Sequence, residues 1–187
     1  MTKYIALLRS INVGGKNIIK MADLKDELSK MGLDKVQTHT KSGNVLFESQ
    51  KNENLLKDEI EQVIYESFGY YIPIVLRNFE EIRQIINQFS LHENRFNTIQ
   101  KSKKKHTYYV ALLDTSLMEK EIRRLHEINV EDEFFILMEK EIYLSLGKAV
   151  PHSRLMNFLQ RTQTVNVIRN WLTIKRLLSF GENINQI

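Results

Sequence analysis

The chain has 187 residues, a length that suits one large domain or two small ones. Its apolar share of 42% and charged share of 27% are typical of a globular protein with a core. Lys and Arg total 27 against 23 Asp and Glu, so the formal charge of +4 mildly favours acidic partners and excludes the dense positive field of a DNA-coating protein.

Cysteine is absent, which excludes disulfides, thiolate metal sites and cysteine nucleophiles. The five histidines are scattered, with no spacing typical of a metal site, so we expect neither metal nor cofactor. The apolar run at residues 4–8 is too short for a signal peptide, and no run approaches the roughly 20 residues of a membrane span. We therefore expect a cytoplasmic protein that does not bind membranes.

The first half alternates short apolar runs with apolar residues at helical spacing. Gly32 and Gly69 end its two helices, and Pro73 suits an edge strand. The expected elements are a strand over 4–8, a polar loop over 9–20, a helix over 21–31, strands over 36–40 and 45–48, a helix over 55–68 and a strand over 72–77. This β-α-β-β-α-β order is the ferredoxin-like arrangement.

A further helix over 82–89 and a polar connector over 90–105 lead to a second half that repeats this order. There we expect a strand over 107–113, a helix over 117–126, strands over 134–138 and 142–146, a helix over 153–160, a short strand over 164–168 and a helix over 169–180. The predicted class is α+β, with two ferredoxin-like (βαββαβ, alpha-beta plait) subdomains and extra helices, at residues 1–90 and 91–187. The halves repeat their order of elements while sharing almost no residue identities.

In this order strands one and three are antiparallel neighbours, so the loop after the first strand and the hairpin at 41–44 should leave the sheet at the same end. Adjacent glycines let backbone N–H groups turn inward, and nearby cations attract an anion. The predicted anion-binding residues are Arg9, Asn12, Gly14, Gly15, Lys16, Lys41, Ser42, Gly43 and Asn44. The spacing differs from that of a P-loop, and a flexible β-to-α connection explains the glycines equally well.

A catalytic role for Ser42 requires a base that a third group orients. His39 shares a strand face with Lys41, but no carboxylate is evident beside it. We therefore expect the Ser42 hydroxyl to contact a ligand rather than to act as a nucleophile.

The tail is basic, because residues 142–181 contain no Asp or Glu. Its cations are Lys148, Arg154, Arg161, Arg169, Lys175 and Arg176. In a helix that begins at Arg169, steps of about 100° place Arg169, Thr173 and Arg176 opposite the apolar face. With Asn170, this stripe is a candidate second wall of the anion site, and a solvated basic face is the alternative. The run Lys103–Lys105 is interpreted as a solvated part of the connector.

Several segments together resemble the domain-of-unknown-function family 1697. They are Leu8 to Lys16, Met21, Leu24, Ser42 to Val45, Phe47, and the tail residues Arg169, Asn170, Trp171, Thr173 and Leu177. The resemblance implies a bacterial cytoplasmic protein with two ferredoxin-like subdomains, and it implies no activity.

The chain departs from the family pattern at three places. Ser10 stands where glycine is usual, and Lys41 stands where glutamine is common. Val167 and Ile168 precede Arg169 where polar residues are more typical. The first change stiffens the loop, and the second adds a charge to the predicted site.

These observations favour a small binding protein for an anionic ligand, either a nucleotide or a nucleic-acid backbone. One alternative is an enzyme that acts on a phosphorylated or carboxylated metabolite, with Ser42, His39 or Lys16 in proton transfer. A second alternative is an interaction or oligomerisation module. The sequence does not decide whether the protein is an enzyme or which oligomeric state it adopts.

Overall fold

The computed structural model describes residues 1–99, 106–147 and 150–182, and it divides into two compact units. Unit 1 comprises Met1–Ile82 with Leu177–Ile187, and unit 2 comprises Arg83–Arg176. The division expected between residues 90 and 91 falls inside helix α3 (Phe79–Ile99). The basic run at 103–105 lies outside the described residues.

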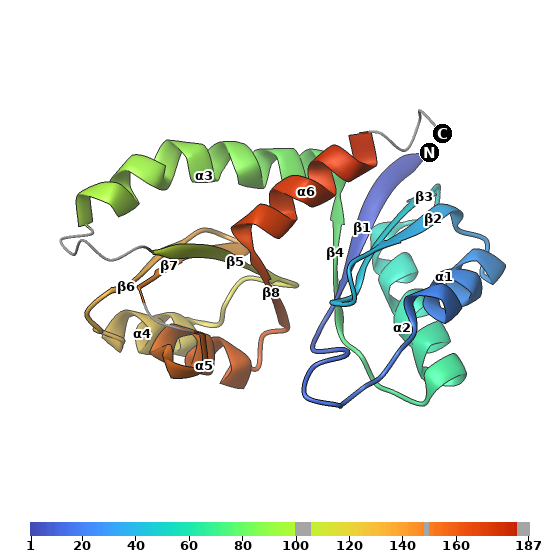
Figure 1. Ribbon diagram of the computed structural model, residues 1–187, viewed down its shortest axis with the longest axis horizontal. Helices are drawn as coiled ribbons and strands as arrows, with labels where there is room; N and C mark the ends of the chain where they lie inside the picture. The colour runs from blue at the N-terminus through green and yellow to red at the C-terminus, as the bar shows by residue number, and fades with distance from the viewer. Residues whose placement is uncertain (100–105, 148–149, 183–187) are drawn as a thin grey trace. The chain divides into compact units, whose positions relative to one another are not determined.

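Unit 1 is a four-stranded antiparallel sheet with two helices on one face (Figure 1). Its elements are β1 (Thr2–Leu8), α1 (Met21–Lys30), β2 (Asp34–His39), β3 (Asn44–Ser49), α2 (Glu53–Phe68) and β4 (Ile74–Asn78). The strand order is β2-β3-β1-β4, so β1 pairs with β3 as expected, and β4, which Pro73 precedes, is an edge strand.

Strand alternation builds the core of unit 1, because every second residue of β1 faces the helices. Tyr4, Ala6 and Leu8 thus join one buried cluster with Leu24 of α1 and Ile60 of α2. Helix α2 begins after Asn52, whose side chain accepts a hydrogen bond from Asn54 N, and ends at Gly69 with φ +74°.

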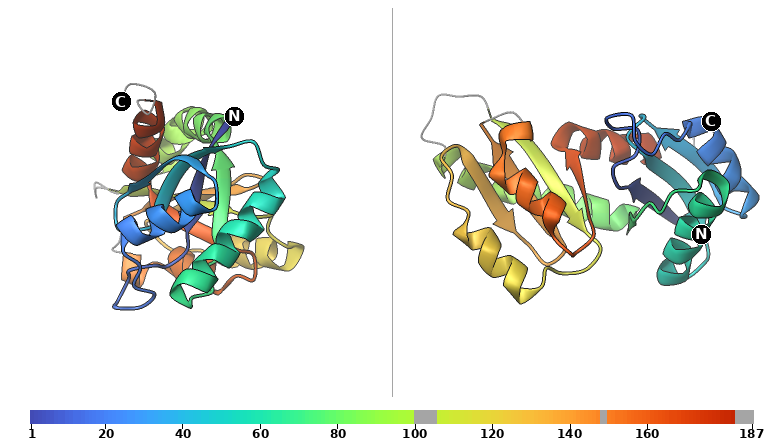
Figure 2. Two further views of the ribbon diagram at one scale, coloured as in Figure 1. Left: turned by 90° about the vertical axis from the view of Figure 1, so that its right-hand side faces the viewer. Right: turned by 90° about the horizontal axis from the view of Figure 1, so that it is seen from below.

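Unit 2 repeats this plan with a second four-stranded antiparallel sheet, in the order β6-β7-β5-β8. Its elements are β5 (Thr107–Leu113), α4 (Glu119–Glu127), β6 (Glu133–Leu137), β7 (Glu141–Leu146), a 3₁₀ turn (Val150–His152), α5 (Arg154–Arg161) and β8 (Asn166–Asn170). Helices α4 and α5 lie side by side on one face of this sheet (Figure 2, right). Helix α3 covers the other face, where the Tyr143 hydroxyl donates to Ile85 O at 2.9 Å.

The α+β class and the repeated β-α-β-β-α-β order are confirmed, but two expected elements are wrong. Helix α3 continues to Ile99, where a polar connector was expected from residue 90, because Phe96 is buried and packs against Tyr108 of β5. The last helix, α6 (Trp171–Glu182), starts two residues later than expected. Strand β8 extends to Asn170, and the Asn170 side chain caps α6 by accepting a hydrogen bond from Leu172 N at 2.9 Å.

The repeat extends to the residues themselves, which corrects the expectation that the halves share almost no identities. The β1 segment Thr2–Leu8 reads TKYIALL and the β5 segment Thr107–Leu113 reads TYYVALL. Residues 75–79 of the first half, VLRNF, correspond in the same way to residues 167–171, VIRNW. Sheet register agrees, because Arg77 lies opposite Ile5 and Arg169 lies opposite the equivalent Val110.

The helices in the described ranges are either too short or too polar to cross a membrane.

Candidate functional site

The loop after β1 and the β2–β3 hairpin meet at one end of the unit 1 sheet, as the topology predicts. Leu8 N donates to Gly43 O at 2.8 Å, and Asn12 Nδ2 donates to Lys41 O at 2.9 Å. We call these two segments, residues 9–16 and 41–44, the rim. The predicted juxtaposition is therefore confirmed, and the question becomes what each rim residue does there.

The two adjacent glycines form the tip of a small hairpin within the loop. Val13 and Lys16 form an isolated antiparallel bridge, with Lys16 N donating to Val13 O at 3.1 Å. Gly14 and Gly15 have φ values of +59° and +75°, as a type I′ turn requires. The turn alone accounts for both glycines.

The rim asparagines direct their side chains at polar groups of the rim and of the residues that flank it. Asn12 exchanges two hydrogen bonds of 2.9 Å with Ile19, in addition to its bond to Lys41. Asn44 is fully buried, and its Nδ2 donates to His39 O and to the hydroxyls of Thr40 and Ser42. Both amides thus hold the loop and the hairpin in shape.

Backbone conformation explains two further rim positions. Ser10 has φ +53°, in the left-handed region that favours glycine. At Gly43, φ is +74° and an added Cβ would lie 2.7 Å from Ile11 Cδ1 and 2.8 Å from Leu8 Cβ. Gly43 is therefore required both by its dihedral angle and by the close approach of the β1 loop.

The charged and hydroxyl groups of the rim differ in exposure. Lys16 and Lys41 are exposed, and Arg9 is half-buried with its backbone N–H donating to Pro73 O at 3.0 Å. The Ser42 hydroxyl lies 2.7 Å from the Thr40 hydroxyl, and the His39 ring contacts the Phe180 ring at 5.3 Å between centroids. These contacts are those of a turn stabilised by its side chains.

The predicted basic stripe of the tail does not form on one helix. Arg169 lies in β8 and only 8% of it is exposed, whereas Arg176 is an exposed residue of α6. Burial lowers the pKa of the Arg169 guanidinium to about 10. Asn170 caps α6 and Thr173 is half-buried. The expectation that Arg169 and Arg176 share a helix face is therefore wrong.

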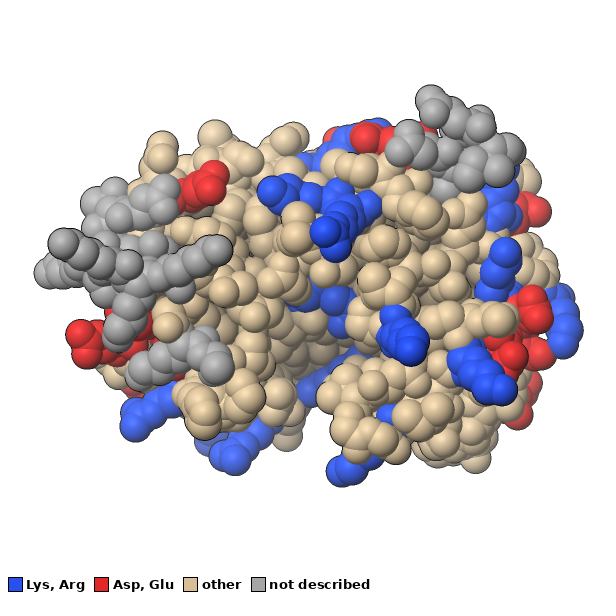
Figure 3. Space-filling view, in the orientation of Figure 1, with Lys and Arg blue, Asp and Glu red and all other residues tan. Residues whose placement is uncertain are grey.

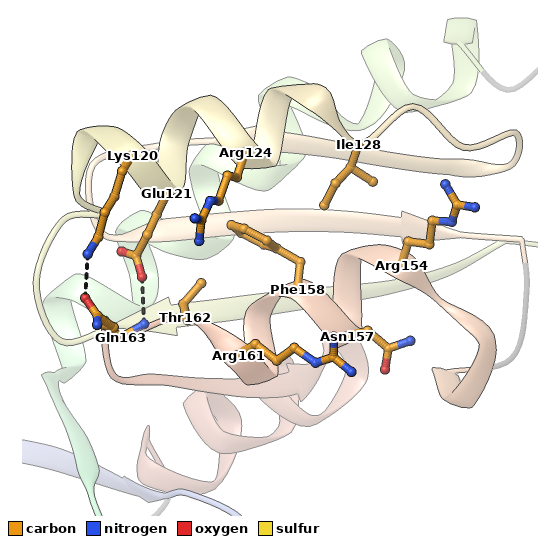
Figure 4. A pocket seen from close by; sticks show the side chains of 10 residues that line it. All are labelled: Lys120, Glu121, Arg124, Ile128, Arg154, Asn157, Phe158, Arg161, Thr162 and Gln163. Atoms are coloured by element: carbon orange, nitrogen blue, oxygen red, sulfur yellow. Dashed lines mark hydrogen bonds between the residues drawn. The ribbon is translucent and has the colours of Figure 1, made fainter.

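A cavity that the sequence analysis did not predict lies in unit 2 between α4 and α5 (Figure 4). Its volume is about 730 Å³, within the range of small-molecule sites. We call it the basic groove. Its lining residues are Lys120, Glu121, Arg124, Ile128, Arg154, Asn157, Phe158, Arg161, Thr162 and Gln163.

Helix geometry brings the cations of the basic groove together. Lys120 and Arg124 are four residues apart on α4, and Arg154 and Arg161 are seven apart on α5, so each pair shares one helix face. Separate blue side chains lie along the lower left edge of Figure 3, in the region of α4 and α5. Four cations thus line the groove against one carboxylate, that of Glu121.

The three guanidinium groups of the groove, those of Arg124, Arg154 and Arg161, make no hydrogen bond or ion pair with any described residue. Arg123, next to Arg124 but outside the groove lining, instead pairs with Glu119 at 2.7 Å. The groove arginines are therefore available to a ligand, while their neighbour is engaged.

The single carboxylate of the groove is occupied by the protein itself. Glu121 is 4% exposed, and its two oxygens accept from Gln163 N at 2.7 Å, Thr164 N at 3.3 Å, the Thr164 hydroxyl at 2.6 Å and Met118 N at 3.2 Å. Burial opposes its ionisation, but these hydrogen bonds prevail and lower the pKa of the carboxyl. Glu121 thus fixes the segment after α5 to α4.

A second buried carboxylate fixes the other end of α5. Glu133 accepts from the Ser153 hydroxyl at 3.0 Å and from Arg154 N and Leu155 N at the start of the helix. Ser153 is itself the N-cap, accepting from Met156 N at 3.1 Å. Both ends of α5 are therefore held, so the side chains that it presents to the groove have a fixed base.

A groove of unit 1 runs along α2 and reaches the residue after α1, with a different lining. Its residues are Met31, Lys51, Asp58, Glu59, Gln62 and Val63, and Met31 caps α1 as Ile128 caps α4. This groove has two acids and one lysine, and Lys51 pairs with Glu59 at 2.6 Å. The basic lining is therefore a property of the groove in unit 2.

Part of the basic groove could have been predicted from the sequence. Arg154 and Arg161 are members of the acid-free tail, and their spacing of seven predicts one helix face. Their partners Lys120 and Arg124 lie on a separate helix, and only the packing of α4 beside α5 joins the two pairs. No group of three or more potential metal-ligating side chains forms within the described ranges.

The chain is similar to a family of known sequences and to a solved structure. The family described as "Protein of unknown function (DUF1697)" matches residues 1–143, a span that includes α4 and ends before α5. A solved structure of a conserved bacterial protein from Streptococcus pneumoniae is similar over 97% of this chain and 99% of its own, with TM-score 0.71 and 20% identity. No curated protein matches.

Proposed function

Because the chain belongs to the DUF1697 family, whose description assigns no activity, we propose from the geometry of unit 2 that it is a binding protein for an anionic ligand. The basic groove is the proposed site. The observation that carries this proposal is the set of three guanidinium groups without a described protein partner around one cavity. Guanidinium groups bind carboxylates and phosphates through two parallel hydrogen bonds.

Two features favour binding in the groove over simple solvation of a basic surface. Helix α5 is held at both ends by buried carboxylates, so its arginines are presented on a fixed backbone. The groove along α2 in unit 1 lacks this charge, because two acids and one lysine line it. A preorganised site binds more tightly because less conformational entropy is lost on association.

The occupied carboxylate favours a binding protein over an enzyme at this site. A carboxylate offers about four lone-pair positions, and Glu121 already accepts four hydrogen bonds. It is therefore unavailable for proton transfer to a ligand in the groove. The remaining lining consists of cations, amides, a threonine and apolar residues.

The test is calorimetric titration with inorganic tripolyphosphate at low and moderate salt. Arg124→Glu and Arg161→Glu should each weaken binding by about tenfold or more, because a hydrogen bond to a charged group contributes about 1.5–3 kcal/mol. The matched control is Arg123→Glu, which makes the same charge change one residue away and outside the groove lining. Moderate salt should weaken binding to the wild type.

Three outcomes would contradict the groove as the site. In the first, tripolyphosphate does not bind to the protein. In the second, Arg123→Glu weakens binding as much as Arg124→Glu does. In the third, Lys16→Glu abolishes binding while Arg124→Glu leaves it unchanged, which would assign the anion to the rim. Lys16 is exposed at the tip of its hairpin, so its substitution leaves the fold intact.

We also infer that each unit is a ferredoxin-like, alpha-beta plait subdomain. The strand orders β2-β3-β1-β4 and β6-β7-β5-β8, both fully antiparallel, support this assignment. Circular permutation that joins the ends of one unit offers a test, because a plait should remain folded when its chain is opened in the β2–β3 hairpin.

A further inference from the structure

The basic groove contains an apolar wall that an anion alone does not need. Phe158 of α5 and Ile128 at the end of α4 both pack against the core of unit 2 and are both only half-buried. Figure 4 shows the Phe158 ring pointing from α5 toward α4, between Arg124 and Ile128. A flat apolar group of a ligand could be buried against this ring.

The groove also offers neutral hydrogen-bonding groups beside the ring. Asn157 precedes Phe158 and is exposed, and its side-chain amide makes no hydrogen bond with any described residue. The Gln163 side chain accepts from Lys120 Nζ at 2.7 Å, which leaves its NH₂ group to donate. Amides of this kind read the polar edge of a nucleobase, because each carries both a donor and an acceptor.

The charge of the groove indicates how much anion the ligand carries. Four cations face one carboxylate, so three positive charges are in excess. One terminal phosphate carries about −1.5 to −2 charge at neutral pH, so roughly two phosphates balance this excess. A carboxylate or a single phosphate would leave cations of the groove unmatched.

We infer that the basic groove binds a nucleoside polyphosphate, with its base against Phe158 and its phosphates on Arg124, Arg154 and Arg161. This inference rests on the proposed function and adds the class of ligand. The unpartnered guanidinium groups supply the phosphate contacts, the half-buried ring supplies a stacking surface, and Asn157 and Gln163 supply base-edge contacts. Stacking of one base on an aromatic side chain is worth about tenfold in affinity or more.

The experiment compares ligands that separate the base from the phosphates. Nucleoside triphosphates with each of the four common bases, inorganic tripolyphosphate and unphosphorylated nucleosides are titrated into the full chain at one salt concentration. We expect at least one nucleoside triphosphate to bind about tenfold more tightly than tripolyphosphate. Nucleosides alone should bind weakly, because they lack the phosphates that the arginines hold.

Two variants at one position isolate the ring. Phe158→Leu keeps an apolar side chain in the core but removes the aromatic face, whereas Phe158→Tyr keeps that face. We expect Phe158→Leu to abolish the advantage of the nucleoside triphosphate while leaving tripolyphosphate affinity unchanged. Phe158→Tyr should preserve the advantage. Circular dichroism and the melting temperature verify that both variants are folded.

Failure of this inference is distinguishable from failure of the proposed function. If tripolyphosphate and all nucleoside triphosphates bind with equal affinity, the ligand is not a nucleoside polyphosphate. The proposal that the groove binds an anion is then still supported. An equal loss of both ligands in Phe158→Leu likewise overturns the role of the ring. If single-stranded oligonucleotides bind more tightly as their length increases, the ligand is a nucleic-acid strand and the inference of a free nucleotide is wrong. Absence of binding by every anion overturns both proposals.

Discussion

The Asn and Gly residues of the rim in unit 1 are explained by hydrogen bonds and turn geometry. Asn12 and Asn44 direct their amides to carbonyl and hydroxyl groups of the rim and its flanking residues, and Gly14 and Gly15 form a type I′ turn. Their side chains and dihedral angles are accounted for before any ligand is considered. A rim built in this way positions Lys16 and Lys41 at the surface, where their charges remain exposed.

Gly43 and Gly14 allow two causes of destabilisation to be compared. Both have positive φ, but only at Gly43 would an added Cβ meet neighbouring atoms. Gly14→Ala should cost about 1–2 kcal/mol through its left-handed dihedral angle alone. Gly43→Ala should cost more, because its Cβ would also lie 2.7 Å from Ile11 Cδ1 and 2.8 Å from Leu8 Cβ. Urea unfolding of both variants measures the difference, and equal losses would show that the β1 loop does not press on the hairpin.

Helix α5 illustrates the role of buried acids at the scale of one element. It has eight residues, and helices shorter than about 12–15 residues are marginal in water on their own. Glu133 satisfies N–H groups at its start, and Glu121 binds the segment after its end. The helix therefore depends on tertiary contacts, and the arginines of the groove depend on the helix.

Glu121→Gln should destabilise the protein in a pH-dependent manner. At pH 7 we expect a loss of about 1–3 kcal/mol, because buried donors lose a charged acceptor. The folded-state pKa of Glu121 is lowered below its ordinary value of 4.5, so the ionised group stabilises the fold above that pH. This contribution disappears as the pH falls through the folded-state pKa.

Urea unfolding of wild type and Glu121→Gln at pH 7 and in acid measures this dependence. The gap between the two proteins should narrow in acid, where the wild-type carboxyl is protonated. A gap of the same size at both pH values would show that the ionisation of Glu121 does not cause the difference in stability. Glu119→Gln is the control, since that carboxylate is exposed and pairs with Arg123 on the same helix.

Elements were predictable from sequence where apolar periodicity was strong, and their ends were not. Trp171, Ile174 and Leu177 place a helix correctly in the tail, but the same wheel accommodates Arg169 two residues before the helix begins. Periodicity cannot separate a strand residue from a helix residue at such a junction. In α3, the polar stretch after Phe89 hid ten further helical residues, of which Phe96 is buried.

At the scale of the whole chain, the dominant feature is the repeat of one β-α-β-β-α-β plan with recognisable residues. The TKYIALL and TYYVALL strands correspond, as do Arg77 and Arg169 in β4 and β8. Equivalent arginines are both buried, at 3% and 8% exposure. The two copies share their strand pattern and differ in the charge of the grooves beside their helices.

The repeat also explains which site could be predicted from sequence. The rim follows from strand order, because adjacent antiparallel strands bring the loop after β1 and the β2–β3 hairpin to one end. The basic groove follows from the packing of α4 beside α5, which are separated by two strands in the sequence. Charge counts identified a basic tail at residues 142–181 but could not select the four cations that line one cavity.

The last residues of α6 belong to unit 1, which gives a prediction about the chain as a whole. A Cβ at Gly181 would overlap the Phe79 ring, and Lys3 Nζ donates to Gly181 O at 3.2 Å. Gly181→Ala should therefore destabilise unit 1 by about 1–3 kcal/mol. Hydrogen exchange should be faster in β1 and β4, while amides of β5 and β7 keep their protection. Equal acceleration in both units would contradict this assignment.

The brevity of α5 also constrains how its chemistry can be studied. A synthetic peptide that spans residues 153–164 would lack both Glu121 and Glu133 and would be mostly random coil in water. Its two arginines would then have no defined separation, and excised fragments would give misleading results in ligand screens. Chemical probes of this region must therefore be applied to the intact polypeptide.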